Sequence, residues 1–333
     1  MSDEVNTPNL ASPAPPLQDA AMTSTLRPTM IAEGAPSDHP NDGTADDAPV
    51  AMWRQRLRIF THNKLAVASV LYLVLITAAC FLVPMIHPTN QTNQALTFGT
   101  RWDAPPSWHH WLGTDSSGFD ELGRIFYGGE YSLTLGIVAG FITIVFGTAY
   151  GMISGFIGGL TDTIMMRFID ALLSIPYIFL LITLIAIFNR STVFLICIIG
   201  FTLWWPNARI IRGDALLIRQ LEYSQAATSM GGGKMHIIRR HVFPNSISNI
   251  VTVATFSVAD AILFLSALGF LGLGIQTPQT DWGTMLQLGT VQIQNGFWWE
   301  VFPLATIFIL VVVAINYIGD ALRDVFEVRL LER

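Results

Sequence analysis

Residues 222–245 read EYSQAATSMGGGKMHIIRRHVFPN and lie between two long apolar segments of the chain. Tyr223, Ala226, Ala227 and Met230 fall at positions i, i+3, i+4 and i+7. This spacing puts the four side chains on one face of a short amphipathic helix. The stretch therefore predicts a helix that presents one small, partly apolar face outside the membrane.

The second half of the stretch predicts a break and a further helix. The glycines at 231–233 can adopt the left-handed conformation that ends a helix, because they have no Cβ. Met235, Ile238 and Val242 then continue an apolar stripe, and Pro244 suits the first turn of the next helix. A helical hairpin of this kind between two membrane spans indicates that a partner docks on it.

The remainder of the chain has the composition of a polytopic, all-α membrane protein. Hydrophobic residues make up 51% of the sequence and charged residues only 13%. Six apolar segments have roughly the 17 to 25 residues that a helix needs to cross a bilayer. These predicted spans are 65–86, 132–157, 171–188, 192–208, 246–270 and 301–319.

The negative formal charge of the chain comes from its N-terminal tail. Residues 1–50 contain eight acidic residues and one arginine, which gives this segment a net charge of −7. The whole chain has −6, so the remaining residues sum to +1. The same segment has eight prolines and almost no aromatic residues, a composition that predicts disorder. The acidic balance therefore describes a tail and carries no information about a transported solute.

The distribution of Lys and Arg predicts the orientation in the membrane. With the N-terminus in the cytoplasm, fourteen basic residues next to the spans fall on the cytoplasmic side. The opposite side has only Arg101, Arg124 and Arg190. Because basic residues concentrate in cytoplasmic loops, both termini and the hairpin at 222–245 are expected to be cytoplasmic.

The hairpin resembles the EAA coupling loop of the membrane subunits of ATP-binding-cassette (ABC) importers. The resemblance rests on Ala226, Ala227, Gly231 and the Phe243-Pro244 ending. Within that family, Glu222-Tyr223 and the RHxxPN ending of residues 240–245 are most similar to the peptide and nickel permease subgroup. The chain differs from the usual pattern at Gln225, where a glutamate is common, and at His241, where isoleucine is common.

The resemblance extends over about two-thirds of the chain. The elements LGTD at 112–115 and GR at 123–124 precede the second span, with Phe119 where many relatives have arginine. FLGLG at 270–274 and PQTDWGTML at 278–286 form a second block, with Leu265 where relatives often have glutamate. The resemblance implies the ABC transmembrane type-1 permease fold with an additional first span. The implied organisation is a disordered acidic tail (1–52), a basic lead-in and first span (53–86), an extracytoplasmic loop (87–130), a permease domain with five helices and the hairpin (131–320), and a cytoplasmic C-terminus (321–333).

The resemblance to ABC importer permeases also implies a function for this chain. The chain is expected to be a permease subunit in the bacterial inner membrane that imports di- or oligopeptides. Its implied partners are a second, homologous permease, two cytoplasmic ATPase subunits that bind ATP and Mg²⁺, an extracytoplasmic solute-binding protein and the lipid bilayer. The residues expected to couple the chain to the ATPases are Glu222, Ala226, Ala227, Gly231, Arg240 and Pro244. No cofactor on this chain is implied.

The chain itself lacks the residue patterns of an enzyme or a nucleic-acid-binding protein. GGGK at 231–234 is followed by Met235 rather than the Ser or Thr of a phosphate-binding loop, so we do not expect this chain to bind ATP. No nucleophile with a base, carboxylate pair, metal-ligand spacing or basic patch with interleaved aromatics stands out. Cys80 and Cys197 lie in predicted spans and indicate no disulfide framework.

Asp260, near the middle of the fifth predicted span, has two interpretations. An intramembrane carboxylate is costly and usually faces a cavity or a bundle interior, so Asp260 is either part of the translocation path or hydrogen-bonded at a subunit interface.

Three alternatives to peptide import remain open from the sequence. The first is an importer of the same family for nickel or glutathione. The second is an ion-gradient-driven secondary transporter, for which Asp260 is the only support. The third is a membrane scaffold or enzyme, against which the missing catalytic set argues.

Overall fold

The computed structural model describes residues 58–86, 88–97, 99–188, 191–276 and 278–327. The chain divides into units 1–47 and 48–333, and the first lies wholly outside the described residues. Three predicted segments lie wholly or partly outside the described residues: the tail (1–52), residues 53–57 of the basic lead-in, and residues 328–333 of the C-terminal segment. The described part is helical and contains no strand, which confirms the all-α fold.

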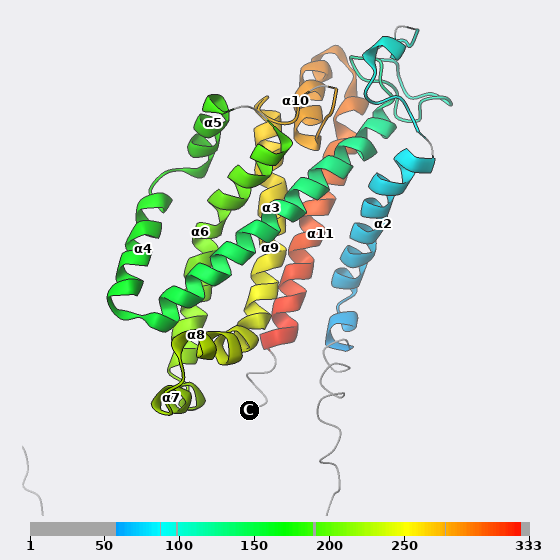
Figure 1. The fold of residues 1–333 in the computed structure, drawn as a ribbon. Coiled ribbons are helices and arrows are strands. Elements are labelled where there is room, and N and C mark those ends of the chain that lie inside the picture. Colours follow the sequence, from blue (N-terminus) through cyan, green and yellow to red (C-terminus); the bar gives the residue numbers. More distant parts are fainter. Residues whose placement is uncertain (1–57, 87, 98, 189–190, 277, 328–333) are drawn as a thin grey trace, which may run out of the picture. The chain divides into compact units, whose positions relative to one another are not determined.

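Five long helices form the body of the described unit. In chain order they are α2 (Lys64–Ile86), α3 (Glu121–Ile157), α6 (Thr192–Arg219), α9 (Phe243–Phe270) and α11 (Phe302–Glu327). Shorter elements connect them: η1 (Gln94–Thr97), α4 (Gly159–Leu173), α5 (Tyr177–Ile187), α7 (Glu222–Ser229), α8 (Lys234–Ile237), the π-helical turn η2 (Ile238–Val242), α10 (Trp282–Gln292), η3 (Ile293–Asn295) and η4 (Trp298–Glu300). Helix α3 crosses and contacts both α6 and α9 (Figure 1).

The described helices provide five single membrane spans, and a sixth if α4 and α5 together count as one. The single spans are Lys64–Ile86, Glu121–Ile157, Thr192–Arg219, Lys234–Phe270 and Trp298–Phe326. Helices α4 and α5 are bent by 78° relative to each other. The span expected at 171–188 is thus not one straight helix. Pro176 lacks an N–H and takes an extended conformation, so the helix ends at Leu173 and restarts at Tyr177.

Helix α3 begins eleven residues before the span expected at 132–157. Asp120 caps its N-terminus, and the carboxylate accepts a hydrogen bond from the Gly123 amide over 2.7 Å. The helix has 37 residues, a length of about 55 Å at 1.5 Å per residue. Because a bilayer core is about 30 Å thick, α3 extends beyond it or is strongly tilted.

A row of small residues brings α3 and α6 into close contact. Gly147, Gly151 and Gly155 recur at every fourth residue of α3. A Cβ on Gly151 would lie 2.4 Å from the Ala208 carbonyl oxygen, and one on Gly155 would lie 2.7 Å from the Arg212 carbonyl oxygen. Helices of membrane proteins approach closely through such rows of small residues. The C-terminal halves of α3 and α6 therefore pack backbone to backbone.

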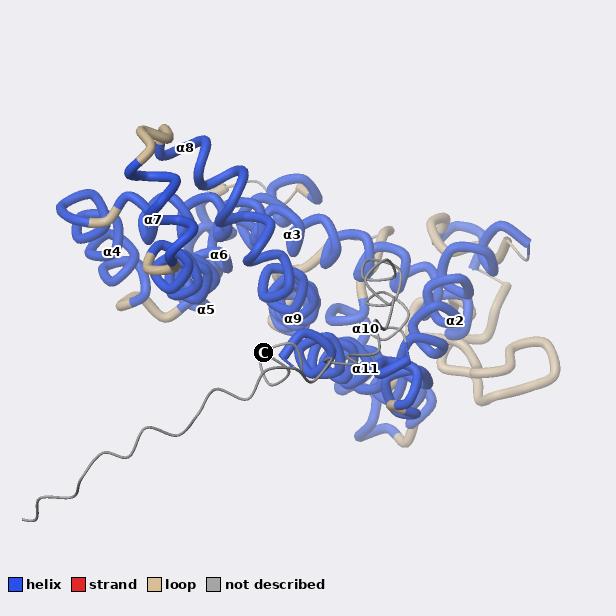
Figure 2. The backbone as a smooth tube through the Cα atoms, turned by 90° about the horizontal axis from the view of Figure 1, so that it is seen from below, coloured by secondary structure: helices blue, strands red, loops and turns tan. Residues whose placement is uncertain are grey.

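Two apolar cores share α3 and α9. One lies between α3, α5, α6 and α9, and the other between α2, α3, α9, α10 and α11. Seen along the bundle, α4, α7 and α8 lie on one side of α9, and α2 and α11 lie on the other (Figure 2). The hairpin that the sequence singles out is thus attached to the α3–α6 side of the structure.

Candidate functional site

Helices α7 and α8 form a hairpin at one end of the bundle, directly after α6 (Figure 1). Helix α6 ends at Arg219, and only Gln220 and Leu221 separate it from α7. The Gln225 side chain donates a hydrogen bond to the Gln220 carbonyl oxygen over 3.0 Å and so holds this turn. The residue that departs from the family pattern therefore stabilises the entry to the hairpin.

Three of the four residues on the face predicted for α7 point outward. Tyr223 is 42% exposed and Met230 is 82% exposed, and Ala226 is exposed as well. Ala227 is half-buried against the apolar cluster beneath the hairpin, and Ser224 is the buried residue of the helix. An exposed surface of this kind, flanked by small residues, is open to a partner.

The glycine break has the expected conformation at one of its three residues. Gly231 has a φ of +82°, which is the left-handed region, whereas Gly232 and Gly233 do not. The Gly232 amide donates to the Ala227 carbonyl oxygen, and a Cβ on Gly232 would lie 2.7 Å from that oxygen. Gly231 thus sets the chain direction, and Gly232 allows the close turn.

The second half of the hairpin is anchored in the bundle. Ile237, Ile238 and Val242 are buried in a cluster with residues of α3 and α6, namely Met152, Phe156, Ile211, Ala215 and Ile218. The predicted stripe of Met235, Ile238 and Val242 is therefore correct for the last two residues. Met235 is 48% exposed, and Ile237 takes its place in the core.

Pro244 lies in the first turn of α9, as predicted, but no gap separates this helix from the turns before it. The chain is helical without interruption from Lys234 to Phe270, and Pro244 lies in the first turn of α9 directly after the π-helical turn. The Phe243 amide donates to the Ile238 carbonyl oxygen, a π-type bond that spans five residues. The span expected at 246–270 thus starts earlier because the π-helical turn accommodates the proline.

Basic side chains cover the outer surface of α8 and η2. Lys234, Arg239 and Arg240 are exposed, and none of them forms an ion pair with another described residue. Met235 and His236 join the two arginines around an open groove of about 330 Å³. Glu222 is also exposed, at the first position of α7.

An aromatic contact connects the two arms of the hairpin. The Tyr223 and His241 rings lie 6.0 Å apart. Partial burial raises the pKa of the Tyr223 phenol.

Asp260 lies exposed on α9, where the structure gives it no hydrogen bond or ion pair with a described residue. Its role in the translocation path therefore stays a prediction.

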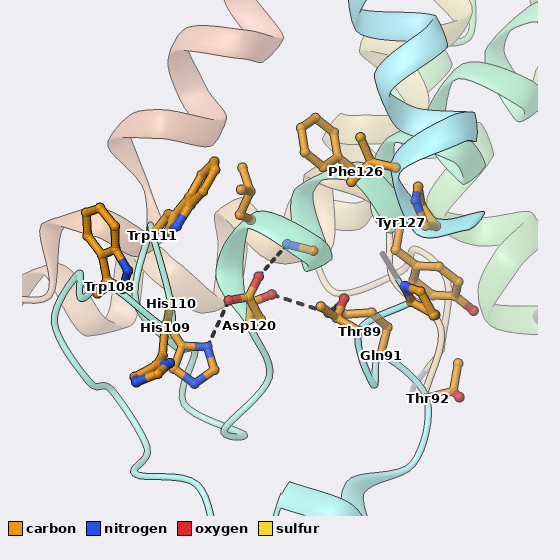
Figure 3. A pocket seen from close by; sticks show the side chains of 15 residues that line it. Thr89, Gln91, Thr92, Trp108, His109, His110, Trp111, Asp120, Phe126 and Tyr127 are labelled. Carbon is orange, nitrogen blue, oxygen red and sulfur yellow. Dashed lines mark hydrogen bonds and ion pairs between the residues drawn. The ribbon is translucent and has the colours of Figure 1, made fainter. Parts of the chain in front are cut away.

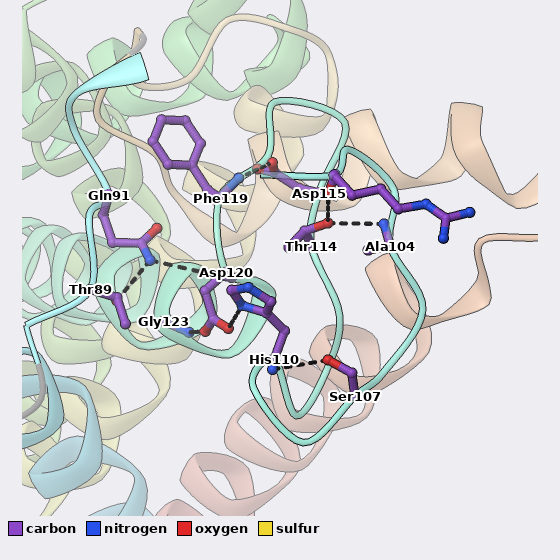
Figure 4. Close-up of polar contacts among 11 residues, drawn as sticks. Thr89, Gln91, Ala104, Ser107, His110, Thr114, Asp115, Phe119, Asp120 and Gly123 are labelled. Carbon is purple, nitrogen blue, oxygen red and sulfur yellow. Dashed lines mark hydrogen bonds and ion pairs between the residues drawn. The ribbon is translucent and has the colours of Figure 1, made fainter. Parts of the chain in front are cut away.

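A cavity of about 870 Å³ lies at the opposite end of α3 (Figure 3). Trp108, Trp111, Phe126 and Tyr127 contribute its aromatic lining. His110 Nδ1 lies 2.9 Å from the carboxylate of Asp120, the residue that caps α3 (Figure 4). His110 thus attaches the loop before α3 to the start of that helix.

The same loop holds a cation–π contact that the sequence left unexplained. The Arg124 guanidinium lies 4.4 Å from the ring centroid of Phe119, which is buried. Asp115 lies 3.6 Å from Arg124, and burial raises the pKa of that carboxyl while the arginine opposes the shift. Phe119 therefore covers the guanidinium of Arg124 with its aromatic ring.

The described residues contain no cluster of three or more His, Cys, Asp or Glu able to hold a metal ion. Cys80 and Cys197 are free thiols on α2 and α6.

Two ion pairs between α4 and α6 were missed in the sequence. Asp162 accepts two hydrogen bonds from Arg212, and Asp170 pairs with Arg209. From the sequence alone, Arg209 and Arg212 were interpreted only as two of the basic residues that set the orientation in the membrane. Their spacing of three residues on one helical face was the available signal, but the partners lie about 40 to 50 residues away in the chain.

Two family profiles match this chain, one over its larger C-terminal part and one near its N-terminus. A sequence profile described as "binding-protein-dependent transport system inner membrane component" matches residues 129–332, which is more than half of the chain. A second, described as the N-terminal transmembrane domain of oligopeptide transport permease C, matches residues 51–106.

Curated relatives match over most of their own length. The oligopeptide transport system permease protein OppC of Haemophilus influenzae is 37% identical over 282 residues, covering 83% of this chain and 88% of the relative. The dipeptide transport system permease protein DppC of Bacillus subtilis is 37% identical over 278 residues, covering 84% and 85%. The glutathione transport system permease protein GsiD of Pectobacterium atrosepticum is 34% identical over 278 residues, covering 84% and 91%.

Proposed function

Because the chain belongs to the family of binding-protein-dependent transport system inner membrane components, we propose that it imports di- or oligopeptides and that residues 222–245 couple it to ATPase subunits. Proteins of this family are transport subunits and not enzymes. They are embedded in the inner membrane and act with a solute-binding protein and an ATPase. The ion-gradient alternative is not favoured by these comparisons.

The observation that carries the coupling proposal is the combination of an exposed and an anchored arm in one hairpin. The face of α7 around Ala226 is open, whereas Ile237, Ile238 and Val242 are buried against α3 and α6. A protein that docks on α7 would therefore move the ends of two membrane helices. Gly231 holds the angle between the arms, and Arg240 and Glu222 offer charges to the partner.

The assembly around this chain is proposed to contain a second, homologous permease and two ATP-binding subunits. ATP and Mg²⁺ bind on those ATPases. The Lys and Arg distribution supports a cytoplasmic hairpin and cytoplasmic termini. Asp260, exposed on α9, is a candidate for the surface that lines the path with the second permease.

Affinity purification from the native membrane tests the assembly. We expect mass spectrometry to identify an ATPase and a second permease, with vanadate-sensitive ATP hydrolysis in the purified complex. Uptake into proteoliposomes with the solute-binding protein, using labelled di-, tri- and tetra-alanine and labelled glutathione, tests the solute. A chain that purifies alone after mild crosslinking, or uptake abolished by a protonophore but not by ATP depletion, would contradict the proposal.

A further inference from the structure

Helix α4 packs on the bundle through one narrow face. It follows Gly158 and Gly159, which have φ values of +66° and +63°, and it ends at the break before Pro176. Of its 15 residues, only Asp162 and Ile169 are buried. Glycine adopts these positive φ values without strain, because it has no Cβ.

Two ion pairs connect α4 to α6, beside an apolar contact in which Ile169 packs with Trp205 and Ala208. Arg212 Nε and Nη2 donate to the two carboxylate oxygens of Asp162 over 2.6 Å and 2.7 Å. The hydroxyl of Ser154, on α3, donates to the same carboxylate. Further along α4, Asp170 pairs with Arg209. A bidentate arginine–carboxylate pair fixes orientation as well as distance, so α4 is held to α6 in a defined direction.

The same part of α6 carries the hairpin. Ile211, Ala215 and Ile218 pack against Ile237 and Val242 of the hairpin. Arg209 and Arg212 lie on this segment of α6, one turn from each other. Movement of the hairpin therefore acts directly on the helical turns that hold α4.

The bend between α4 and α5 interrupts a possible membrane span, so its position affects the neighbouring helices. Helix ends inside a membrane are tolerated where protein covers them or where they border water. A shift of α4 would move this bend relative to α6 and α9.

We propose that Arg212–Asp162, assisted by Arg209–Asp170, transmits movement of the coupling hairpin to the α4–α5 span. The four residues are positioning residues for the transport step, and the inference rests on the proposed function of the hairpin. Arg212–Asp162 carries the larger share, because the Asp162 side chain is only 13% exposed, whereas both members of Arg209–Asp170 are about half exposed.

The test measures uptake per ATP hydrolysed in the full complex, reconstituted with its solute-binding protein and labelled di-, tri- and tetra-alanine. Asp162→Asn removes the charge and one acceptor of the bidentate pair. We expect at least a tenfold loss of uptake while ATP hydrolysis stays within about twofold of wild type. The exchange Asp162→Arg with Arg212→Asp should recover part of the uptake. Arg167→Gln, an exposed residue of α4 without an ion pair among the described residues, is the matched control.

The outcomes separate this inference from the proposed function. If Asp162→Asn has the same uptake per ATP hydrolysed as wild type, including the case in which uptake and hydrolysis fall in proportion, this inference is wrong. The proposed function of the hairpin is not affected by that result. If Asp162→Asn fails to assemble, the half-exposed pair decides, and Asp170→Asn must then lower uptake per ATP at normal assembly. Absence of any ATP-dependent uptake by the wild-type complex would instead contradict the proposed function.

Discussion

The indole Nε1 of Trp282 donates a hydrogen bond to the main-chain carbonyl oxygen of Ile125 over 2.9 Å, and both residues are fully buried. The Trp282 amide also donates to the Ser132 hydroxyl over 3.0 Å. Because Trp282 begins α10 and the other two residues belong to α3, the contacts hold the short helix α10 against the outer part of α3.

Replacing Trp282 with Phe removes the indole donor and leaves most of the ring. The buried carbonyl of Ile125 then loses a partner, which should lower the free energy of unfolding by about 1 to 2 kcal/mol. Thermal unfolding of the detergent-purified complex measures the loss. Trp298→Phe, at a position that is 53% exposed, is the control. Equal losses for both variants would contradict the structural role of the bond.

The buried carboxyl group of Asp281 should make the stability of the protein depend on pH. Its carboxylate accepts hydrogen bonds from the Ile275 amide and from the amide and hydroxyl of Thr284. Burial raises the pKa of Asp281 above its ordinary value of 3.8. The folded protein therefore binds this proton more tightly than the unfolded chain does. The stability contributed is complete below the unfolded pKa and is lost as the pH rises through the folded pKa.

Asp281→Asn should remove this component of the pH dependence, because the amide does not titrate. Asp281→Ala should lower the free energy of unfolding by about 0.5 to 2 kcal/mol through loss of the helix cap. Unfolding temperatures of the three proteins across acidic to neutral pH provide the comparison. An unchanged slope in the Asn variant would show that other groups cause it.

Gly231→Val should abolish uptake while membrane insertion stays intact. The left-handed φ of +82° strains a β-branched residue by about 1 to 3 kcal/mol, although no atom lies within 4 Å of the new Cβ. The variant therefore tests the conformation of the turn and not its packing.

Gly233→Val is the matched control for this turn. Its φ is −62° and its surroundings are equally open, so uptake should remain near wild type. Normal uptake by Gly231→Val, measured in the same vesicles, would count against the coupling role of the hairpin.

Gly151→Leu should separate α3 from α6. Even its Cβ would lie 2.4 Å from the Ala208 carbonyl oxygen, and overpacking of this kind costs about 1 to 3 kcal/mol or more. Size-exclusion chromatography of the solubilised protein should show a smaller folded fraction. Gly213→Leu on α6, where no atom lies within 4 Å of the Cβ, should fold normally. Comparable losses would indicate that any added bulk is harmful.

Much of the fold follows from local sequence. The apolar run in α2 predicts a helix from 65 to 86, and the structure has Lys64–Ile86. The start of α3 was missed because Glu121, Arg124 and Glu130 interrupt the apolar pattern. Hydropathy reports where a helix is apolar and not where its hydrogen bonds begin. The cap by Asp120 was the signal that could have found this start.

The candidate site was predictable where its geometry is local and unpredictable where it is not. The left-handed Gly231 and the two arms of the hairpin follow from residues a few positions apart. The choice of Ile237 over Met235 for the core depends on the surface that α3 and α6 provide. The partners of Arg209 and Arg212 depend on how α4 folds back, which no local pattern determines.

The π-helical turn Ile238–Val242 sets the rotational phase between the hairpin and α9. Such a turn contains one residue more than an α-helical turn does. The wider turn takes up this extra residue, whereas deletion of a single residue from the regular winding of α9 would rotate everything before it by about 100° about the helix axis. Lys234 and the exposed face of α7 would then point in another direction with their composition unchanged. The direction in which the hairpin faces is thus encoded in the number of residues in this segment as much as in their identity.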